Sequence, residues 1–304
     1  MPIPIKVTIV ISTFNHEKFL SAAIESVLSQ KVNFNIQILI TDDGSTDQTQ
    51  TIIEQFENRY PNTIILLKSK NNKGINNNIF KTQDNLKGEY IAVLDGDDYW
   101  TNDLKLQKQA DFLDLNKEYN GVFHDTKIEH LDDSNQVLFD QKYLYSQNYQ
   151  YKSIIFPSDM IDRNCILPSS SAFFRKSAIR VEDLKLIDDN YSFLWKLCCI
   201  MIKESKYFFI NEVWSVYRNH KEGISKSNNQ LFHESHICFL RKLLSDSFYK
   251  GYKYDIYRTI SNEYKIILDS PKKKVNSFLD KHFILYIQFE IKKIISYYRF
   301  LTPK

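Results

Sequence analysis

Short apolar runs alternate with stretches of helical periodicity over the first hundred residues. The runs have the length and composition of buried strands and cover residues 6–12, 36–40, 63–67 and 90–95. Apolar residues at helical spacing follow the first two runs: Leu20, Ala23, Ile24, Val27 and Leu28, then Ile52, Ile53 and Phe56. Strands and helices joined by short connections predict an α/β fold with a mostly parallel, helix-covered sheet of the nucleotide-binding kind.

Carboxylates stand where two of these strands end. Asp42 and Asp43 follow the second run, and Asp95 and Asp97 follow the fourth. The carboxyl ends of parallel strands meet at one edge of a sheet, which is where ligands bind in such folds. We therefore expect these four acids to lie close together.

Carboxylates this close repel one another unless something binds them. A divalent cation with oxygen ligands would relieve the repulsion at Asp95 and Asp97, and it would also neutralise charge developing on a departing phosphate. The alternative is that Asp97 or Asp98 caps a helix beginning near Asn102.

The first acidic pair also has two interpretations. One of its carboxylates could accept a hydrogen bond from a base N–H or a ribose hydroxyl. Alternatively, Asp42 and Asp43 are acids clustered at a helix start, where the helix dipole favours them.

Two later features offer similar choices. Asp188 and Asp189 could supply a general base for an attacking hydroxyl, or simply form the acidic first turn of a helix. His220 lies in a segment, residues 217–225, that we interpret as a polar loop. It could bind metal or phosphate, or be a solvated loop histidine.

The composition predicts one large domain with an appendage. The chain has 304 residues, of which 43% are hydrophobic, and from about Asn228 onward its pattern changes to helices rich in Lys, Tyr, Phe and Ile. We expect a catalytic domain over 1–227 and a helical extension over 228–304.

Charge is unevenly distributed between these parts. Residues 241–304 carry 14 Lys and Arg against 6 Asp and Glu, a net +8, so the total of +3 leaves −5 for residues 1–240. The basic, aromatic tail could contact an anionic membrane surface, or it could be a cap that buries its aromatic residues or forms a dimer. The acidic body and the lack of a nucleic-acid motif exclude nucleic-acid binding as a main function.

The location predicted from the sequence is cytoplasmic. The four cysteines show no CxxC spacing, the start does not resemble a signal peptide, and no run approaches the roughly 18 apolar residues of a membrane span. The expectation is a protein that is soluble or peripheral at the inner face of the cytoplasmic membrane.

Four successive segments resemble the signatures of glycosyltransferase family 2. They are Ile9 to Asn15, Asp42 to Asp47, Asn72 to Ile75, and Leu94 to Trp100. The resemblance is strong over residues 5–115 and continues more weakly to about 225. It implies a GT-A fold, a nucleotide-sugar donor, a divalent cation (Mn²⁺ or Mg²⁺) and transfer with inversion at the anomeric carbon.

The resemblance also assigns roles by position on the donor side. Asp43 would contact the nucleobase in a pocket lined by Thr13 and Phe14, and Asp95 would contact the ribose or the sugar. Asp42 and Lys73 join this donor set. Asp97 would bind the metal, and His220, in an element that includes Ser225, would lie at the metal and diphosphate.

On the acceptor side, the resemblance implies contacts from Ser170, Ser171, Arg175 and Trp100. Asp189 matches the acid that serves as base, and its neighbour Asp188 is the alternative. An acceptor hydroxyl would be activated on one face of the sugar while the nucleoside diphosphate departs from the other.

Members that resemble this chain build surface polysaccharide, lipopolysaccharide or capsule on glycan or lipid-linked acceptors. We therefore expect a UDP-sugar donor, such an acceptor, membrane contact through the tail, and a homodimer as a further option. The alternatives are a catalytically silent nucleotide-binding scaffold and a sugar nucleotidyltransferase. The latter usually carries a glycine-rich phosphate loop near its start, whereas Ser12 to His16 contains no glycine.

Overall fold

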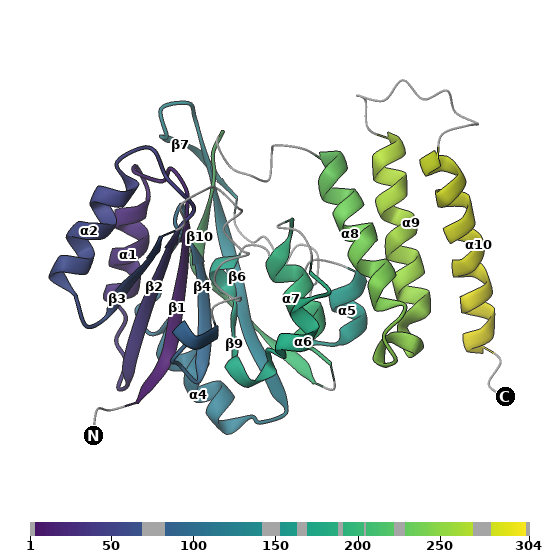
Figure 1. The fold of residues 1–304 in the computed structure, drawn as a ribbon, viewed down its shortest axis with the longest axis horizontal. Coiled ribbons are helices and arrows are strands. Elements are labelled where there is room, and N and C mark those ends of the chain that lie inside the picture. Colours follow the sequence, from purple (N-terminus) through teal and green to yellow (C-terminus); the bar gives the residue numbers. More distant parts are fainter. Residues whose placement is uncertain are drawn as a thin grey trace. The chain divides into compact units, whose positions relative to one another are not determined.

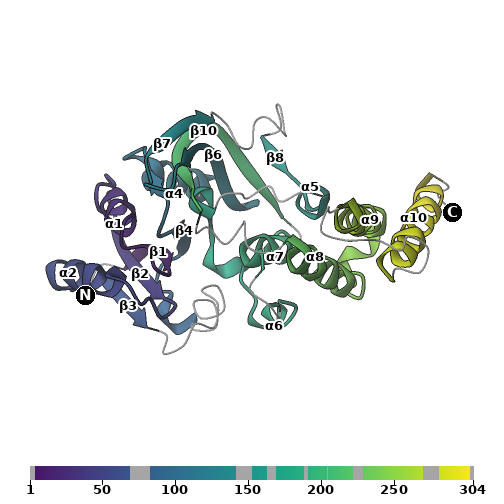
Figure 2. The same cartoon turned by 90° about the horizontal axis from the view of Figure 1, so that it is seen from above.

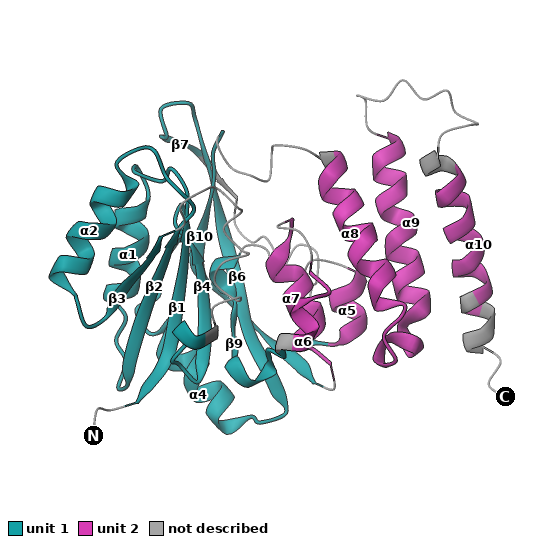
Figure 3. Cartoon of the chain, in the orientation of Figure 1, with its two compact units in different colours: residues 1–155, 166–181, 204–222 teal, residues 156–165, 182–203, 223–304 magenta. Residues whose placement is uncertain are grey.

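A computed structural model describes residues 4–68, 83–141, 153–162, 169–187, 191–203, 205–221, 229–269 and 281–301. The chain forms two compact units (Figure 3). Unit 1 comprises residues 1–155, 166–181 and 204–222, and unit 2 comprises residues 156–165, 182–203 and 223–304. Each unit is considered by itself below.

Unit 1 is built on one mixed sheet (Figure 1). Its strands are β1 (Ile5–Thr13), β2 (Asn35–Asp42), β3 (Ile64–Lys68), β4 (Tyr90–Asp95), β5 (Tyr99–Trp100), β6 (Tyr119–Leu131), β7 (Val137–Gln141), β8 (Ile154–Ile155), β9 (Phe173–Arg175) and β10 (Lys206–Asn219). The main order is β3-β2-β1-β4-β9-β6-β10-β5. Strands β1 to β4 pair in parallel, as expected, and β9 is antiparallel to both of its neighbours.

Helices cover the parallel half of this sheet. They are α1 (Leu20–Leu28), α2 (Thr49–Arg59) and α4 (Lys105–Leu115), with short 3-10 turns at Gln83–Asn85, Ser169–Ser171 and Lys176–Ala178. Figure 2 shows α1 and α4 on the same side of β1, β2 and β4. Alternate residues of β1 point to one face of the sheet, and Val7, Ile9 and Ile11 therefore share one core with the apolar sides of α1 and α4.

The strand register brings the polar strand ends together. Thr13, the last residue of β1, pairs with Asp42, the last residue of β2. On the other side of β1, Ser12 pairs with Asp95, the last residue of β4. The expectation that these acids follow adjacent carboxyl ends of strands is confirmed.

Unit 2 is helical. Its helices are α5 (Pro157–Asp162), α6 (Val181–Leu184), α7 (Phe193–Met201), α8 (Asn229–Leu243), α9 (Lys253–Asp269) and α10 (Lys281–Leu301), with a 3-10 turn at Phe248–Tyr252. The indole N–H of Trp195 on α7 donates to the carbonyl of Met160 on α5 at 2.8 Å, and the ring packs against Phe239 on α8. The expected C-terminal helices are therefore present, and they share a core with α5 and α7.

The two units are not divided at one position in the sequence, because each comprises three separate segments. Unit 2 takes α5 and α7 from within residues 1–227, because their apolar sides pack with the C-terminal helices. The functional boundary at 227 and 228 stays a prediction. Among the described helices, none combines the length and the apolar character needed to cross a membrane.

A partly buried carboxylate joins α8 to α9. Glu263 on α9 accepts hydrogen bonds from Nδ1 of both His233 and His236 on α8, the second at 2.9 Å. Nε2 of His236 also contacts the Ser192 hydroxyl at 2.8 Å. Burial by itself would raise the pKa of Glu263, but hydrogen bonds from the two histidines outweigh it and hold the pKa below 4.5.

Replacing Glu263 by Gln should lower the free energy of unfolding at pH 7 by about 2 kcal/mol, because a neutral amide cannot match the ionised acceptor. A carboxylate with a depressed pKa in the folded state stabilises above its unfolded pKa and loses that effect as pH falls through the folded value. The difference between wild type and E263Q in urea unfolding should therefore shrink below about pH 4.5. The exposed Glu182→Gln on α6 is the control, and equal losses in both variants would contradict the prediction.

Candidate active site

The loops after β1 and β2 are held together by reciprocal hydrogen bonds. Asn15 lies in the left-handed region with φ 54°, which asparagine tolerates better than most residues. Its backbone N–H donates to the Ser45 hydroxyl at 2.8 Å, and its side-chain oxygen accepts from the backbone N–H of Thr46 at 2.8 Å. This bridge fixes the two loops that present Phe14 and Asp43.

The two acids of the second strand end have different surroundings. Asp42 accepts hydrogen bonds from the backbone N–H of Ser45 at 3.1 Å and from the Gln50 amide at 2.8 Å. Asp42 therefore shapes the turn, in which Gly44 has φ 82°. Asp43 is buried, and its backbone N–H donates to the carbonyl of Thr13 at 3.1 Å. Because α2 begins only at Thr49, the alternative of a helix-start cluster is wrong.

Asp97 meets two histidines at the end of β4. Its Oδ2 lies 3.0 Å from Nε2 of His220 and 3.7 Å from Nε2 of His16. His220 is only 3% exposed, and its ring packs against Phe19 with centroids 4.9 Å apart. The alternative of a solvated loop histidine is therefore wrong.

Arg218 holds the acidic turn from the end of β10. Its guanidinium donates to the carbonyl of Asp97 at 3.0 Å, and its backbone N–H donates to Oδ1 of Asp98 at 3.0 Å. Residues Tyr217 to Asn219 belong to β10 and pair with β6, so the predicted polar loop begins later than expected. The side chain of Asp98 thus accepts a hydrogen bond from the backbone of β10. Since α4 begins only at Lys105, neither Asp97 nor Asp98 caps that helix.

The three carboxyl groups titrate differently. Burial, and then the negative charge of Asp97, raises the pKa of Asp95 to about 7. Burial and both neighbouring acids raise the pKa of Asp98 well above its usual range. Burial also acts on Asp97, but its hydrogen bond with His220 and the charges of His16 and His220 leave its pKa below the usual value. Asp97 is therefore the carboxyl of the cluster that holds its negative charge most firmly.

Several buried polar atoms at this edge have no hydrogen-bond partner within the described part of the chain: Oδ2 of Asp98, Nδ1 of His220 and Oγ1 of Thr13. A depression of about 350 Å³ opens beside His220 and is lined also by Asp132, Asp133, Asn135 and Lys221. Of these three residues, only His220 lines the depression. Buried polar atoms without a partner are features expected where a polar ligand binds.

The carboxylates of the acidic turn fit a divalent cation that is also coordinated by a bound ligand. In the described residues, no three His, Cys, Asp or Glu side chains form a metal-binding group by themselves. Mg²⁺ and Mn²⁺ sites in phosphate-binding enzymes usually need only one or two carboxylates, with phosphate oxygens and water completing the shell. The carboxylates of Asp95 and Asp97, separated by Gly96 at a strand end, meet that requirement.

Comparison with known proteins identifies the family. A model described as glycosyl transferase family 2 matches residues 8–181. The chain belongs to glycosyl transferase family 2. The fold expected from the resemblance, a GT-A fold with added C-terminal helices, is confirmed.

The similar proteins differ in how much of this chain they match. The minor teichoic acid biosynthesis protein GgaA of Bacillus subtilis is 26% identical over 318 residues, covering 91% of this chain and 67% of its own length. The S. aureus TarS 1–349 structure in complex with UDP-GlcNAc has a TM-score of 0.69 at 15% identity, covering 96% of this chain and 89% of its own.

The mannosyltransferase PcManGT from Pyrobaculum calidifontis, solved with GDP-Man and Mn²⁺, has a TM-score of 0.54 at 12% identity, covering 99% of this chain and 90% of its own. The chain spans 60% of the length of the mycobacterial relatives that it matches.

The structure gathers part of the site predicted for a family 2 member. Thr13, Asp43, Asp95 and Asp97 lie at adjacent strand ends, and His220 contacts Asp97. The predicted Lys73, Asp188, Asp189 and Ser225 lie outside the described residues. Their roles stay predictions.

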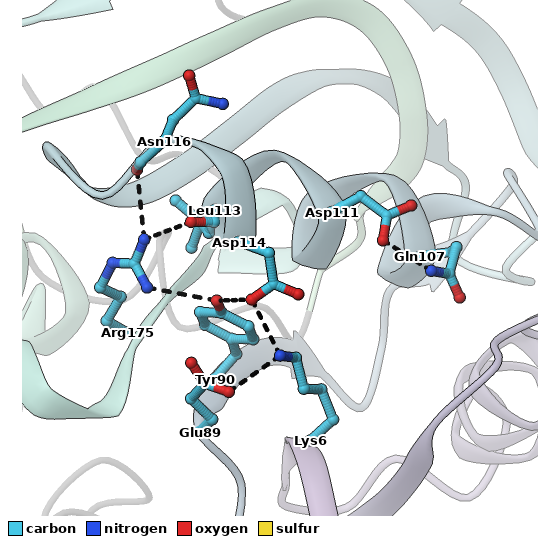
Figure 4. Close-up of polar contacts among 9 residues, drawn as sticks. All are labelled: Lys6, Glu89, Tyr90, Gln107, Asp111, Leu113, Asp114, Asn116 and Arg175. Atoms are coloured by element: carbon cyan, nitrogen blue, oxygen red, sulfur yellow. Dashed lines mark hydrogen bonds and ion pairs between the residues drawn. The ribbon is translucent and has the colours of Figure 1, made fainter.

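Arg175 contacts the end of α4 (Figure 4) and lies at the end of the sheet opposite Asp95. It pairs with Tyr90, the first residue of β4, whereas Asp95 is the last. Five residues of strand place these positions about 16 Å apart. The Arg175 guanidinium donates to the carbonyls of Leu113 and Asn116 at the end of α4. The charge of Arg175 thus satisfies carbonyls at a helix terminus. These contacts give no support to a place beside the acceptor, which stays a prediction of the resemblance.

Trp100, Ser170 and Ser171 are parts of the interior. Trp100 is 4% exposed, its indole N–H donates to the carbonyl of Ser170 at 2.9 Å, and the Lys105 ammonium lies 4.0 Å from its ring centroid. The carbonyl of Ser171 accepts from the buried Gln109. Their polar groups are used within the core, and the acceptor contacts that the resemblance implies for these residues stay predictions. The neighbouring Ser169 instead hydrogen-bonds Asp95.

Sequence reasoning missed His16, Asp98 and Arg218 as parts of the site. For His16, the available signal is its place directly after the left-handed Asn15 at the end of β1. Asp98 and Arg218 are 120 residues apart, and only the pairing of β10 with β6 and β5 brings them together.

Gly96 allows the turn after β4 to approach the end of β1 and the loop that follows it closely. A Cβ atom there would lie 2.9 Å from both Oγ1 of Thr13 and Nδ1 of His16, and 3.0 Å from the carbonyl oxygen of Ser12. We expect Gly96→Ala to displace these groups and to weaken nucleotide binding about tenfold or more. Gly251→Ala is the matched control, since a Cβ at Gly251 meets nothing within 4 Å. Calorimetric titration with UDP measures the change, and equal affinity in both variants would contradict the expectation.

Proposed function

We propose that the chain is a metal-dependent inverting glycosyltransferase that moves a sugar from a UDP-sugar to a hydroxyl of a glycan or lipid-linked acceptor in surface polysaccharide synthesis. The observation that carries the proposal is the clustering of Asp95, Asp97 and His220 at the strand ends beside Asp43, in a chain of glycosyl transferase family 2. Two similar structures that contain UDP-GlcNAc or GDP-Man with Mn²⁺ support a nucleotide-sugar donor and a cation.

The described residues suit the donor side of this reaction. Asp43 would accept a hydrogen bond from the base, with Thr13 and Phe14 beside it. The hydrogen bond between Asn15 and Ser45 holds together the loops after β1 and β2 that carry these residues. Asp95 would accept from the ribose or the sugar. Asp97, oriented by His220, would hold Mn²⁺ or Mg²⁺, whose charge stabilises the departing diphosphate. Arg218 keeps the acidic turn in place through its bond to the carbonyl of Asp97.

On the acceptor side, the hydroxyl oxygen would attack the anomeric carbon as its proton passes to a carboxylate. The bond from that carbon to the diphosphate oxygen breaks, and the nucleoside diphosphate leaves from the opposite face. The family resemblance assigns the carboxylate to Asp189, with Asp188 as the alternative. A lipid-linked acceptor would place the reaction at the inner face of the cytoplasmic membrane. The similarity to GgaA, a minor teichoic acid biosynthesis protein, supports a role in surface polysaccharide synthesis.

The proposal is tested with the full chain by calorimetric titration with UDP, GDP, ADP and CDP, each with and without Mn²⁺. We expect tight binding of UDP that requires the metal, and slow release of UDP from one of a panel of UDP-sugars. Binding of no nucleotide would overturn the donor assignment. Metal-dependent binding of UDP without hydrolysis or transfer of any UDP-sugar would favour the silent scaffold, and formation of UDP-sugar from UTP and sugar phosphate would favour the nucleotidyltransferase.

A further inference from the structure

Helix α10 presents a row of isoleucines that its own unit leaves uncovered. Ile284, Ile287, Ile291, Ile294 and Ile295, here called the isoleucine stripe, are each between 41% and 52% exposed. Their spacing of three and four residues places them on one face of the helix. Five large β-branched residues in a continuous exposed row exceed the scattered apolar residues of an ordinary surface.

The opposite face of α10 accounts for its packing on α9. Phe289 is 2% exposed, and its ring centroid lies 5.9 Å from that of Tyr257 and 5.8 Å from that of Tyr264. Glu290 accepts from Ser261 on α9 and from Lys293 on its own helix. Phe289 is five positions from Ile284 and two from Ile291, so it points well away from the stripe. Packing within unit 2 therefore explains why α10 lies against α9, but it does not explain why the exposed isoleucine stripe is apolar.

Charge decides what could cover the stripe. Residues 241–304 carry a net +8, and α10 itself contains Lys281, Lys292, Lys293 and Arg299 against the single acid Glu290, which is already paired. Two copies of so basic a tail would repel each other. A surface of anionic lipid would attract it, at a distance set by the salt concentration.

Area argues in the same direction. Even a large aromatic side chain carries only about 150–250 Å² of surface, so five half-exposed isoleucines offer well under the roughly 800 Å² per partner of a standard protein interface. Insertion into a lipid surface has no such threshold, because each apolar side chain that enters the acyl region adds its own contribution.

We propose that α10 is a membrane-binding helix whose isoleucine stripe inserts into the surface of an anionic lipid bilayer while its basic residues contact the headgroups. The helix would lie in the plane of the interface, since it lacks the apolar length needed to span. The contact deepens the proposed function by bringing the enzyme to the surface that holds a lipid-linked acceptor, but it needs neither donor nor metal.

The proposal is tested by sedimentation of the full chain with vesicles of phosphatidylcholine, pure or with about one-third phosphatidylglycerol. We expect binding to the anionic vesicles that weakens between about 0.1 M and 0.5 M NaCl. The double variant I287E/I291E should bind roughly a hundredfold more weakly, because two inserted isoleucines are lost. Ile266→Glu, which replaces an isoleucine 50% exposed on α9, is the matched control and should bind like wild type.

Tryptophan fluorescence gives a second readout that does not depend on folding defects. The three native tryptophans are at most 4% exposed. In I291W, the added indole should shift to shorter wavelength and be quenched by brominated lipid on adding anionic vesicles, whereas I266W should not respond.

Three outcomes would overturn the membrane assignment: no binding of the wild type to anionic vesicles, equal binding by I287E/I291E and I266E, or a wild-type dimer that I287E/I291E dissociates. The last would make a second copy the occupant. Because these experiments omit nucleotide and metal, any of these results would leave the calorimetric test of the glycosyltransferase untouched, and failure of that test would leave vesicle binding intact.

Discussion

Replacing Asp97 by Asn should lower kcat for sugar transfer by about a thousandfold or more. The Asp97 carboxylate is held ionised by its hydrogen bond with His220 and is only 15% exposed. Asn keeps the shape of the side chain but has no charge with which to hold a cation against the diphosphate. The same change should remove the dependence of UDP binding on Mn²⁺, as measured by calorimetric titration.

The control for Asp97→Asn is Asp103→Asn, which removes an exposed carboxylate paired with Lys31. We expect Asp103→Asn to keep transfer activity and metal-dependent UDP binding. Urea unfolding of both variants should show that they remain folded. Metal-dependent UDP binding at wild-type affinity in Asp97→Asn would exclude Asp97 as a ligand.

Replacing Arg175 by Ala should lower the free energy of unfolding by about 2–4 kcal/mol and leave the KM for the acceptor unchanged in the folded enzyme. The guanidinium of Arg175 donates to the carbonyls of Leu113, Asn116 and Tyr119, and also to the Tyr90 hydroxyl. Alanine would leave these partly buried acceptors without a donor at the junction of α4, β4 and β9. Urea unfolding and steady-state kinetics measure the two effects.

The matched control is Arg59→Ala at the exposed end of α2, where the guanidinium lies over the ring of Phe56, 6.0 Å from its centroid. Its effect on unfolding should stay within about 0.5 kcal/mol. A raised acceptor KM with unchanged stability in Arg175→Ala would support the acceptor role that the resemblance implied.

The parallel half of the sheet could be predicted because its strands are short and apolar, and because segments of clear helical period follow the first two. The four predicted runs match β1 to β4 to within two residues at each end. The place of Asp42, Asp43, Asp95 and Asp97 followed from the same pattern, because parallel strands necessarily align their carboxyl ends.

The second half of the sheet was harder to predict because its strands pair across long separations. β6 and β10 are 13 and 14 residues long, but neither stands out in the sequence as a continuous apolar run. Both strands carry polar residues on positions that the fold buries, such as His124, Asp125 and Ser215. Polar residues at buried positions interrupt the apolar pattern by which a strand is predicted from sequence.

The sequence by itself determined the family, the α/β order of the first hundred residues, the acids at the strand ends and the amphipathic, basic tail, since each depends on neighbours along the chain. Only the tertiary structure decided which side chains the acids meet. It placed His220 and Arg218 on the acidic turn, moved Arg175 to the far end of the sheet, and buried Trp100. Those positions depend on pairing between strands about 80 to 120 residues apart in the sequence. The residues of one strand do not specify which distant strand it pairs with or in which register.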